Sequence, residues 1–538
     1  MEENGTMEAP RPLAGGRATY GGRTTEWSRA LRDGRALRRA PVQVHGLRPL
    51  PADVSAPRTL PWLVAVSALF VLLQVALVAP GSGLGWDETV YASQVSRHAP
   101  PAFFSAPRAR GITYLIAPVT ELTSSTTVLR IVLALLSGAG LLGALWIWRR
   151  LLPTRVLALG GALFATLWIT LYYAPQAMPN PWSAYATLAA VGCFLRAVRD
   201  RTDRWARVML PLAVAVVALM RPPDAVWLVL ALAAAALAVP RWRRPGLVLL
   251  LVGGLVLGGA DWVVEAYTSY GGLIARLHRA AEIQGGIGWN VAVEDQIRSL
   301  DGVGLCRPCD VPWSHPVTAV WWFALPVLVL GGILAAVRAR RPATALLPGA
   351  VALVMAAPYL FLIDYAAPRF LLPGYALLAL PVADCVWRLI AGGDRLRPFA
   401  TVLFAVALLG HLAVQGAVLT GNTARNRHMH QDFTAVATAL HGLGLRPPCT
   451  LSGENAVQIA YYTGCASRQI GGPDASITPD GLRAEANRRP VALLVPPRTA
   501  PPAYARSWHP APLPDSTRFR GYRAYLAPVP KARKTAVR

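Results

Sequence analysis

The chain has 538 residues, of which 54% are hydrophobic and only 15% are charged, and its mean hydropathy is +0.39. A soluble chain of this length needs about 25% charged residues to cover its surface, so the composition excludes a string of soluble domains. The formal net charge of +25 would suit a nucleic-acid partner, but the sequence has only two lysines, and most of its arginines lie in short runs between apolar stretches. That pattern is typical of polytopic membrane proteins, and we expect no nucleic-acid partner.

Residues 1–58 are rich in arginine, glycine and proline and show no sustained periodicity. They lack the short apolar core and the small-residue cleavage site of a secretory signal peptide. We expect a disordered basic tail in the cytoplasm that touches anionic lipid headgroups.

Eleven apolar stretches follow this tail, and several approach the roughly 20 residues that a helix needs to cross a bilayer. They cover residues 61–80, 127–147, 156–173, 183–198, 208–220, 224–240, 246–267, 318–337, 343–363, 370–390 and 399–420. The fifth and sixth are short, so they form either two short spans or a helical hairpin packed within the protein. The pattern predicts an all-α polytopic membrane protein with about 11 transmembrane helices in residues 59–420.

Arginine runs occupy alternate connections between these stretches, at residues 149–155, 199–207, 241–244, 338–341 and 388–397. Basic connections stay in the cytoplasm during membrane insertion, so we expect the N-terminal tail and these five connections to face the cytoplasm. An odd number of spans then puts the C-terminal region outside. The wealth of arginine, alanine and glycine beside so little lysine suggests a GC-rich bacterial genome, and hence the bacterial plasma membrane.

Three segments on the outer face are long enough to build structure, namely residues 81–126, 268–317 and 421–538. The last segment has helical patterns at 431–440, 454–463 and 480–489, strand patterns at 449–452, 465–470 and 491–495, and a hairpin pattern around 519–526. Strands that alternate with short helices predict a small extracytoplasmic α/β domain with a parallel or mixed sheet.

Four of the six cysteines, Cys306, Cys309, Cys449 and Cys465, lie on the expected outer face, which is the oxidising side. The other two lie within apolar stretches, where they are most simply buried apolar side chains. Cys306 and Cys309 form a C-x-x-C pair, but no second pair and no paired histidines lie nearby in the sequence to complete a zinc site. Structural disulfides are the simplest role for the four, and three connectivities are open.

The most informative segment is Gly85–Tyr91, with the sequence GWDETVY, which follows the first apolar stretch. Its adjacent carboxylates, Asp87 and Glu88, repel each other at a membrane interface unless a substrate or a cation compensates them. A solvated loop tolerates the same pair without any function. The residues alone leave both interpretations open.

An Asp-Glu pair followed by a tyrosine in the first external loop resembles the membrane glycosyltransferases of the GT-C fold. The nearest branch is the superfamily of protein O-mannosyltransferase and aminoarabinose lipid A transferase. Three further segments are similar: residues 107–110 (PRAR) running into Tyr114, the second external loop 175–181 (PQAMPNP) and the late segment 367–373 (APRFLLP). The resemblance covers about residues 60–420, and its one sharp motif is the acidic pair.

The resemblance implies transfer of a sugar from a polyprenyl-phosphate donor to a glycan, lipid or protein acceptor. It also implies that the protein is surrounded by membrane lipids. Asp87 would be the base that takes the proton of the acceptor hydroxyl, with inversion at the anomeric carbon, and Glu88 would orient the site or help to hold a divalent cation. Arg369, Arg108 and Arg110 are candidates to bind the donor phosphate, which gathers negative charge as it leaves. Each of these arginines could instead extend to lipid headgroups.

One position departs from the family pattern, because some relatives carry an acid in the second external loop where this chain has Asn180. Few carboxylates are available for a hard cation, which needs several oxygen ligands. Whether a divalent metal ion is a cofactor is therefore left open. The residues expected to line the cleft are Tyr91, Asn180, Asp224, Glu265, Asp364 and Tyr365.

The sequence thus favours a membrane glycosyltransferase, of the hexosyl- or pentosyltransferase kind, that uses a lipid-phosphate sugar. The alternative is a transporter or flippase of lipid-linked sugars, in which the same acids and arginines line a pathway. A transporter places charged groups near the membrane midplane, but the apolar stretches are almost free of acids at their centres. A third interpretation is a noncatalytic scaffold whose external domain binds partners.

Overall fold

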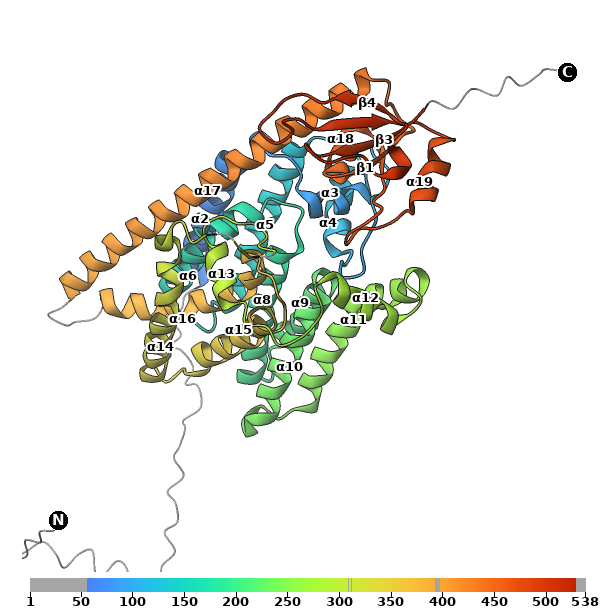
Figure 1. Ribbon diagram of the computed structural model, residues 1–538. Helices are drawn as coiled ribbons and strands as arrows, with labels where there is room; N and C mark the ends of the chain where they lie inside the picture. Colours follow the sequence, from blue (N-terminus) through green and yellow to red (C-terminus); the bar gives the residue numbers. More distant parts are fainter. Residues whose placement is uncertain (1–55, 308, 311, 392–396, 529–538) are drawn as a thin grey trace, which may run out of the picture. The chain divides into compact units, whose positions relative to one another are not determined.

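The computed structural model describes residues 56–307, 309–310, 312–391 and 397–528 (Figure 1). The predicted basic tail therefore lies outside the described residues up to residue 55, and helix α2 begins at Ala56. The described chain is helical through its apolar part and carries one small sheet near its C-terminal end. The predicted fold class is confirmed.

Each of the eleven apolar stretches consists mainly of helix. In chain order these helices are α2 (Ala56–Leu73) with η1 (Gln74–Val78), α5 (Thr126–Trp148), α6 (Thr154–Ala165), α7 (Trp168–Tyr173), α8 (Pro179–Arg199), α9 (Arg204–Met220), α10 (Pro222–Ala238), α11 (Pro245–Ser269), α14 (Val320–Arg338), α15 (Ala343–Phe361), α16 (Leu372–Ala391) and α17 (Arg397–Gly442). Among the described residues, seven helical segments are long and apolar enough to cross a membrane, as expected of a multi-pass membrane protein. The count of about 11 spans stays a prediction, because apolar helices such as α6 and α10 are shorter.

The third apolar stretch was expected as one helix but is broken into α6 and α7. The backbone of Leu167 between them is extended. The backbone N–H of Trp168 donates to Oε1 of Gln415 on α17 at 2.8 Å, and its indole N–H donates to the carbonyl oxygen of Leu300 at 3.1 Å. Because distant parts of the chain satisfy these groups, hydropathy along the sequence could not reveal the break.

The centre of the membrane part is α16, which packs against α6, α8, α14 and α15. It is 89% buried within the protein, whereas α14 is 17% buried and therefore offers most of its surface to the surroundings. Small residues bring neighbouring helices close together: a Cβ atom added at Gly332 on α14 would lie 2.0 Å from the carbonyl oxygen of Pro381 on α16. The most buried span leads directly into the cavity described below.

The connections gather at two ends of the helices. At one end, the loop between α3 (Trp86–Ser93) and α4 (Gly111–Thr120) contacts α12 (Leu273–Ile283), whose Arg276 donates to the carbonyl oxygen of Arg108 at 3.0 Å. Helix α13 (Val293–Ser299) follows α12. At the other end, Arg199 donates to the carbonyl oxygen of Arg150 at 2.9 Å, so two of the arginine-rich connections touch. This grouping fits the alternation of charge, while the compartment that each end faces stays a prediction.

The C-terminal region forms a five-stranded mixed sheet in the order β2-β1-β3-β5-β4. Its strands are β1 (Thr450–Gly453), β2 (Ala466–Ser467), β3 (Val491–Val495), β4 (His509–Pro512) and β5 (Arg523–Leu526), and its helices are α18 (Ala456–Thr463) and α19 (Pro479–Ala486). Strands β2, β1 and β3 are parallel, and β3, β5 and β4 are antiparallel. Disulfides join Cys449 to Cys465 in this domain and Cys306 to Cys309 in the loop after α13.

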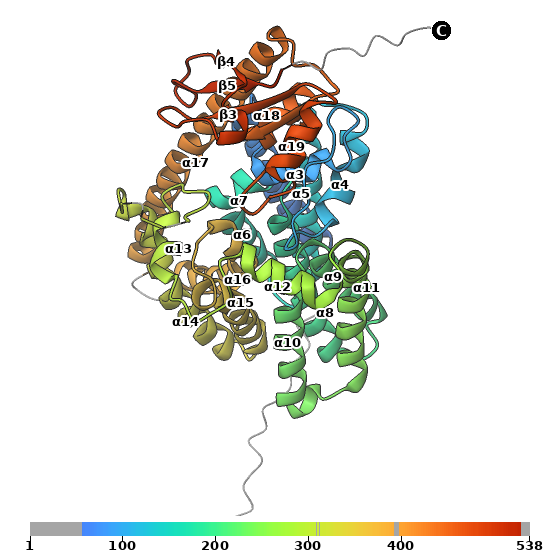
Figure 2. The same ribbon diagram turned by 45° about the vertical axis from the view of Figure 1, so that its right-hand side comes forward.

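The helix expected at residues 431–440 is not separate from the last span, because α17 continues without interruption to Gly442. The predicted domain boundary at residue 421 therefore falls inside a helix. At that point the side chains change from apolar to polar, but no proline follows Pro398 in the helix to end it. Figures 1 and 2 both show α17 running beside the membrane helices and ending against the sheet, with α3 next to α18.

Candidate active site

A cavity of about 570 Å³ lies where α3, the loop before α4, the junction of α9 with α10, the end of α15 and the short helix η4 (Pro368–Leu371) meet. Among the described residues, its charged lining consists of four arginines and two aspartates. These are Arg108, Arg221, Arg307, Arg369, Asp87 and Asp474. Four positive charges against two negative ones leave a formal excess of two positive charges in the cavity wall.

Asp87 stands in the first turn of α3, where the helix begins after Gly85. The positive end of a helix dipole favours a carboxylate at this position. The Asp87 side chain is 35% exposed and faces the cavity. Its two oxygens are held by two arginines: Oδ1 lies 2.8 Å from Nη2 of Arg108, and Oδ2 lies 3.2 Å from Nη2 of Arg369.

These arginines set the charge state of the Asp87 carboxyl group. Burial alone would raise its pKa, but the positive charges of Arg108 and Arg369 outweigh burial and hold the pKa below its usual value of 3.8. The phenol of Tyr91, one turn further along α3, also lines the cavity, and burial raises its pKa to about 12. At neutral pH the cavity therefore presents an ionised Asp87 beside a neutral Tyr91.

Arg369 reaches the cavity because a proline shapes the backbone before it. Ala367 precedes Pro368 and is extended, as residues before proline usually are, and η4 begins at Pro368. The guanidinium group of Arg369 donates through Nη1 to the carbonyl oxygen of Gly304 at 2.7 Å and bonds Asp87 through Nη2. Its Nε is buried and has no hydrogen-bond partner among the described residues.

The sequence interpretation missed Arg221, which lies in the short connection between the fifth and sixth apolar stretches. Pro222 stands at the first position of α10, where its missing N–H costs nothing, and Arg221 before it is outside helical geometry. Nε of Arg221 bonds Oδ2 of Asp224 at 2.9 Å, and Nη2 donates to the hydroxyl of Tyr359 at 2.6 Å. These bonds hold the guanidinium group at the cavity wall. The signal in the sequence was an arginine followed by two prolines and an acid.

Glu88, expected to act in catalysis or metal binding, is not in the cavity wall. Its carboxylate is buried and forms a two-pronged ion pair with Arg130 of α5. It also accepts hydrogen bonds from the backbone N–H groups of Ala177 at 2.7 Å and Gly85 at 3.0 Å. Four donors thus occupy its oxygens. Neighbouring residues on a helix point about 100° apart, so Asp87 can face the cavity while Glu88 ties α3 to the membrane helices.

Arg110 and Glu265 likewise lie away from the cavity wall. Arg110 pairs with Glu265 of α11 at 2.6 Å, and Glu265 also binds Arg276, which is fully buried, at 2.8 Å. Arg276 in turn holds the backbone carbonyl of Arg108. The expected roles of Arg110 in phosphate binding and of Glu265 in lining the cleft are therefore not supported, because both side chains are spent on fixing the loop that carries Arg108.

The remaining expected cleft residues divide between cavity and surroundings. Tyr365 and Asn180 line the cavity. Asp224 is buried behind Arg221 and accepts from Ser183 at 3.1 Å, so it supports the wall without forming it. Asp364 is exposed, lies beside Gly285 and does not line the cavity.

Asn180 has an unusual environment at the start of α8. It is 1% exposed, and within the described part of the chain neither its amide nitrogen nor its amide oxygen has a hydrogen-bond partner. An unpaired buried amide costs stability, and this one borders the cavity. A polar ligand that enters the cavity would supply the missing partners.

The residues around Asp87 do not fit a bound divalent cation. Among the described residues no group of three or more His, Cys, Asp or Glu side chains could hold a metal ion. The oxygens of Asp87 face two guanidinium groups, and those of Glu88 are used by Arg130 and by backbone donors. Hard cations need several free oxygen ligands, so the chemistry below passes through no metal.

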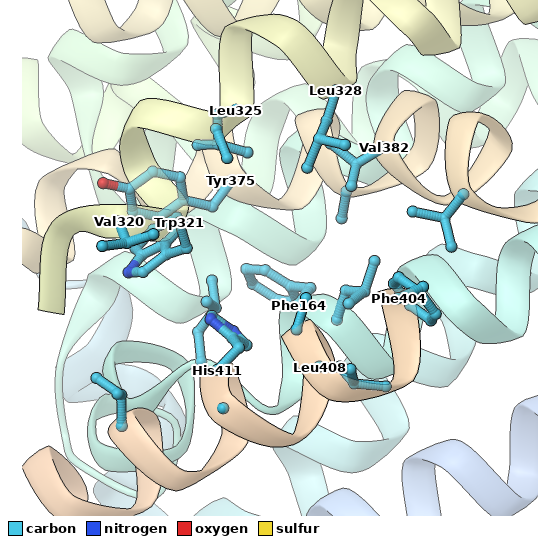
Figure 3. Close-up of a pocket in the computed structure, with 18 of the residues that line it drawn as sticks. Phe164, Val320, Trp321, Leu325, Leu328, Tyr375, Val382, Phe404, Leu408 and His411 are labelled. Carbon is cyan, nitrogen blue, oxygen red and sulfur yellow. The ribbon is translucent and has the colours of Figure 1, made fainter. Parts of the chain in front are cut away.

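A second cavity, of about 620 Å³, lies between α6, α14, α16 and α17. Figure 3 shows Phe164, Trp321, Tyr375, Phe404 and His411 around it. Its lining among the described residues holds no carboxylate and no arginine. Its wall is almost entirely apolar: His411 and Tyr375 are its titratable side chains within the described chain, and none of its side chains there is an arginine that could bind a phosphate. The cavity at Asp87, which has both a carboxylate and arginines, is therefore the candidate active site.

Comparison with solved structures identifies the fold. Crystal structures of ArnT from Cupriavidus metallidurans, one bound to undecaprenyl phosphate and one in the apo state, are similar with TM-scores of 0.60 and 0.59 at 14% and 15% sequence identity, and each comparison covers 87% of this chain and 98% of ArnT. The arabinofuranosyltransferase AftD from mycobacteria is similar with a TM-score of 0.48 at 12% identity, over 87% of this chain and 40% of AftD. No protein-family model and no curated protein sequence matches the chain. The chain has the GT-C fold, as the resemblance in its sequence predicted.

Proposed function

We propose that this chain with the GT-C fold is a membrane glycosyltransferase that moves a sugar from a polyprenyl-phosphate donor to an acceptor hydroxyl. The observation that carries the proposal is the position of Asp87: a partly exposed carboxylate in a cavity wall, held between Arg108 and Arg369. The similarity to ArnT, whose crystal structure holds undecaprenyl phosphate, supports a donor of this class.

The charge of the cavity suits a phosphate leaving group. A sugar phosphodiester carries one negative charge, and the lipid phosphate that leaves carries close to two. The lining has a formal excess of two positive charges, and counting Asp224, which pairs with Arg221 behind the wall, the excess is one. It rises to two when Asp87 takes a proton, so the charge of the wall matches that of the phosphate both before and after the sugar–phosphate bond breaks. Preorganised groups that favour the charge developed in the transition state are a main source of catalysis, and arginines suit the planar, two-pronged recognition of phosphate.

The apolar part of the wall suits the lipid. Trp227 of α10, Pro358 of α15 and the loop residues Ile287, Leu362 and Ile363 line one part of the cavity. A ligand with a charged head and a hydrocarbon chain would thus meet both kinds of surface. This arrangement favours a lipid-borne sugar over a free nucleotide sugar.

The reaction follows from these positions. Donor phosphate attracts the guanidinium groups of Arg108 and Arg369, which weakens their hold on Asp87. The freed carboxylate becomes more basic, because the positive charges that lower its pKa are now shared with phosphate. Asp87 takes the proton of the acceptor hydroxyl, and the acceptor oxygen bonds to the anomeric carbon. The carbon–oxygen bond to phosphate breaks with its electron pair on the phosphate, and the single displacement inverts the anomeric centre.

We place the site on the outer face of a bacterial plasma membrane, with the N-terminal tail of residues 1–58 in the cytoplasm and the sheet domain outside. The alternation of arginine-rich connections supports this orientation. The cavity lies at the end of the helices where α3, α12 and the sheet domain meet, away from the contacts between Arg199 and Arg150. The acceptor is then a glycan, lipid or protein outside the cytoplasm.

The experiment measures transfer of radiolabelled sugar from a polyprenyl-phosphate donor in membranes that contain the wild-type chain or Asp87→Asn. We expect the variant to lose transfer by a factor of about 10² to 10⁴, the usual contribution of a general base, and to retain binding of undecaprenyl phosphate. Full activity in the variant eliminates Asp87 as the base. Movement of labelled donor across the bilayer without any transfer would instead indicate a flippase.

A further inference from the structure

The sheet domain contributes a side chain to the cavity wall. Asp474 lies in the loop between β2 and α19, and its side chain is 6% exposed. It accepts a hydrogen bond from Nε1 of Trp86 at 2.6 Å and pairs with Nη1 of Arg108 at 3.0 Å. Trp86 and Arg108 are 388 and 366 positions away in the sequence. Nothing in the local sequence predicts these contacts.

Asp474 touches the two residues that surround the proposed base. Trp86 directly precedes Asp87 and begins α3. Arg108 uses Nη2 for Asp87 at 2.8 Å, while Nη1 bonds Asp474 and the hydroxyl of Ser105. Nη1 therefore anchors the guanidinium group, and Nη2 is the nitrogen that contacts Asp87. A guanidinium group held in this way keeps its orientation when phosphate binds.

The loop that carries Asp474 is held firmly against the sheet domain. The backbone N–H of Ser476 donates to the carbonyl oxygen of Gln469 at 2.8 Å, and the N–H of Gln469 donates to the hydroxyl of Ser476 at 3.1 Å. The side-chain amide of Gln469 also donates to the carbonyl oxygen of Gly453, the last residue of β1, at 3.2 Å. These bonds close the loop into a turn and hold Asp474 in a fixed position relative to the sheet.

We propose that Asp474 is a positioning residue of the active site, so that the site is complete only with the sheet domain in place. The proposal rests on the glycosyl-transfer function proposed above. Asp474 fixes α3 through Trp86 and also fixes the phosphate-binding guanidinium group of Arg108. The negative charge of Asp474 also offsets part of the positive charge of Arg108. The pKa of Asp87 is therefore higher than Arg108 alone would make it.

A charge-specific test separates this role from general support of the fold. The charged and titratable groups around Asp87 are Arg108, Arg221, Arg369 and the phenols of Tyr91, Tyr173 and Tyr365. Asp474→Asn keeps a hydrogen-bond acceptor for Trp86 but removes the negative charge beside Arg108. The positive charge of Arg108 then acts fully on Asp87 and lowers its pKa further. We expect the acid limb of the pH profile of kcat/KM to move to lower pH by about half a unit.

The same variant should lose activity through misplacement. We expect kcat to fall about 10-fold or more in Asp474→Asn, since a small displacement at a reaction centre is costly, and Asp474→Glu to recover part of the loss. The matched control is Asp480→Asn in α19 of the same domain, because the Asp480 side chain is 90% exposed and pairs with the exposed Arg483. Wild-type kinetics and pH profile in Asp474→Asn overturn the proposal.

A measurement that needs no activity keeps the test independent of the proposed function. Hydrogen–deuterium exchange of purified protein in detergent reports the backbone of α3 and of residues 105–110. We expect faster exchange there in Asp474→Asn than in the wild type and in Asp480→Asn. If the wild-type chain transfers no sugar, the proposed function fails, and exchange alone decides the positioning role. Unchanged exchange in Asp474→Asn would then refute it.

Discussion

The guanidinium group of Arg369 lies 3.2 Å from the carboxylate of Asp87, although 282 residues separate them in the chain. The contact closes a late helical segment onto the loop that follows the first span. It joins the group proposed to take a proton with a group proposed to receive the leaving phosphate. In the absence of donor the two neutralise each other, and the contact between them is the one that phosphate must replace.

Removing the charge of Arg369 should weaken phosphate binding. We expect Arg369→Gln to raise the Kd for undecaprenyl phosphate by about 10- to 100-fold, the equivalent of one or more hydrogen bonds to a charged group. Titration of purified protein in detergent with undecaprenyl phosphate gives the Kd. The matched control is Arg388→Gln in α16, whose side chain is 40% exposed and interacts with Asp384. Equal affinities in wild type and Arg369→Gln would exclude Arg369 from the phosphate site.

The dependence of activity on pH should follow the neighbours of Asp87. Because Arg108 and Arg369 outweigh burial and lower its pKa, the carboxylate stays ionised down to the lowered value. Any stability that its ion pairs contribute is complete above the usual pKa of 3.8 and is lost as the pH falls from there through the lowered value. Arg369→Gln removes one positive charge, so the acid limb of kcat/KM should move to higher pH. This direction is opposite to that expected for Asp474→Asn. A shift of both variants in the same direction would contradict the electrostatic account.

Glu88 should matter for folding more than for chemistry. Glu88→Gln leaves the fully buried Arg130 without its counter-charge, and breaking a buried ion pair costs about 3–5 kcal/mol. We expect a large fall in the temperature of thermal unfolding, with far less loss of transfer per folded molecule than in Asp87→Asn. Glu121→Gln, at an exposed position after α4, is the control. Normal stability with abolished transfer would restore Glu88 as a catalytic residue.

We expect the unpaired amide of Asn180 to contribute to substrate binding and not to the stability of the fold. Asn180→Leu keeps the approximate shape and removes no hydrogen bond from the protein, so the unfolding temperature should stay equal or rise. We expect KM to increase about 10-fold, the effect of roughly one lost hydrogen bond. Asn426→Leu gives the contrast, since Asn426 accepts from Ser82 at 3.0 Å and from the N–H of Gly83 at 2.9 Å and should lose stability. Reduced stability in Asn180→Leu would show that the amide has a protein partner.

Hydropathy and charge alternation were sufficient for the fold class, because long apolar helices and basic connections are properties of local sequence. The chemistry was harder to assign residue by residue. Asp87 and Glu88 are adjacent, but the turn of α3 sends one to the cavity and the other to Arg130. The same holds for Arg108 and Arg110, whose separation depends on Glu265 of a distant helix. Side-chain direction in a short helix or loop is set by tertiary partners.

Asp474 illustrates the limit of motif-based assignment. It belongs to a glycine-rich loop of the sheet domain with no catalytic pattern, and its contact with Arg108 exists only once the domain is docked. Arg221 differs, because its two prolines mark a bend in the apolar region at which a charged residue can face a cavity. An arginine at such a bend is a signal that sequence reading can use.

Because α17 is unbroken, it fixes the rotation of the sheet domain about the helix axis relative to the membrane helices. An α-helix turns about 100° and rises about 1.5 Å per residue, so one residue inserted between the apolar half of α17 and Phe433 swings the domain by more than a quarter circle. Seven inserted residues return it to almost the same bearing but lift it by about 10 Å. Domain exchange among chains of this architecture must therefore preserve helix phase as well as length, or the loop that holds Asp474 will face empty solvent.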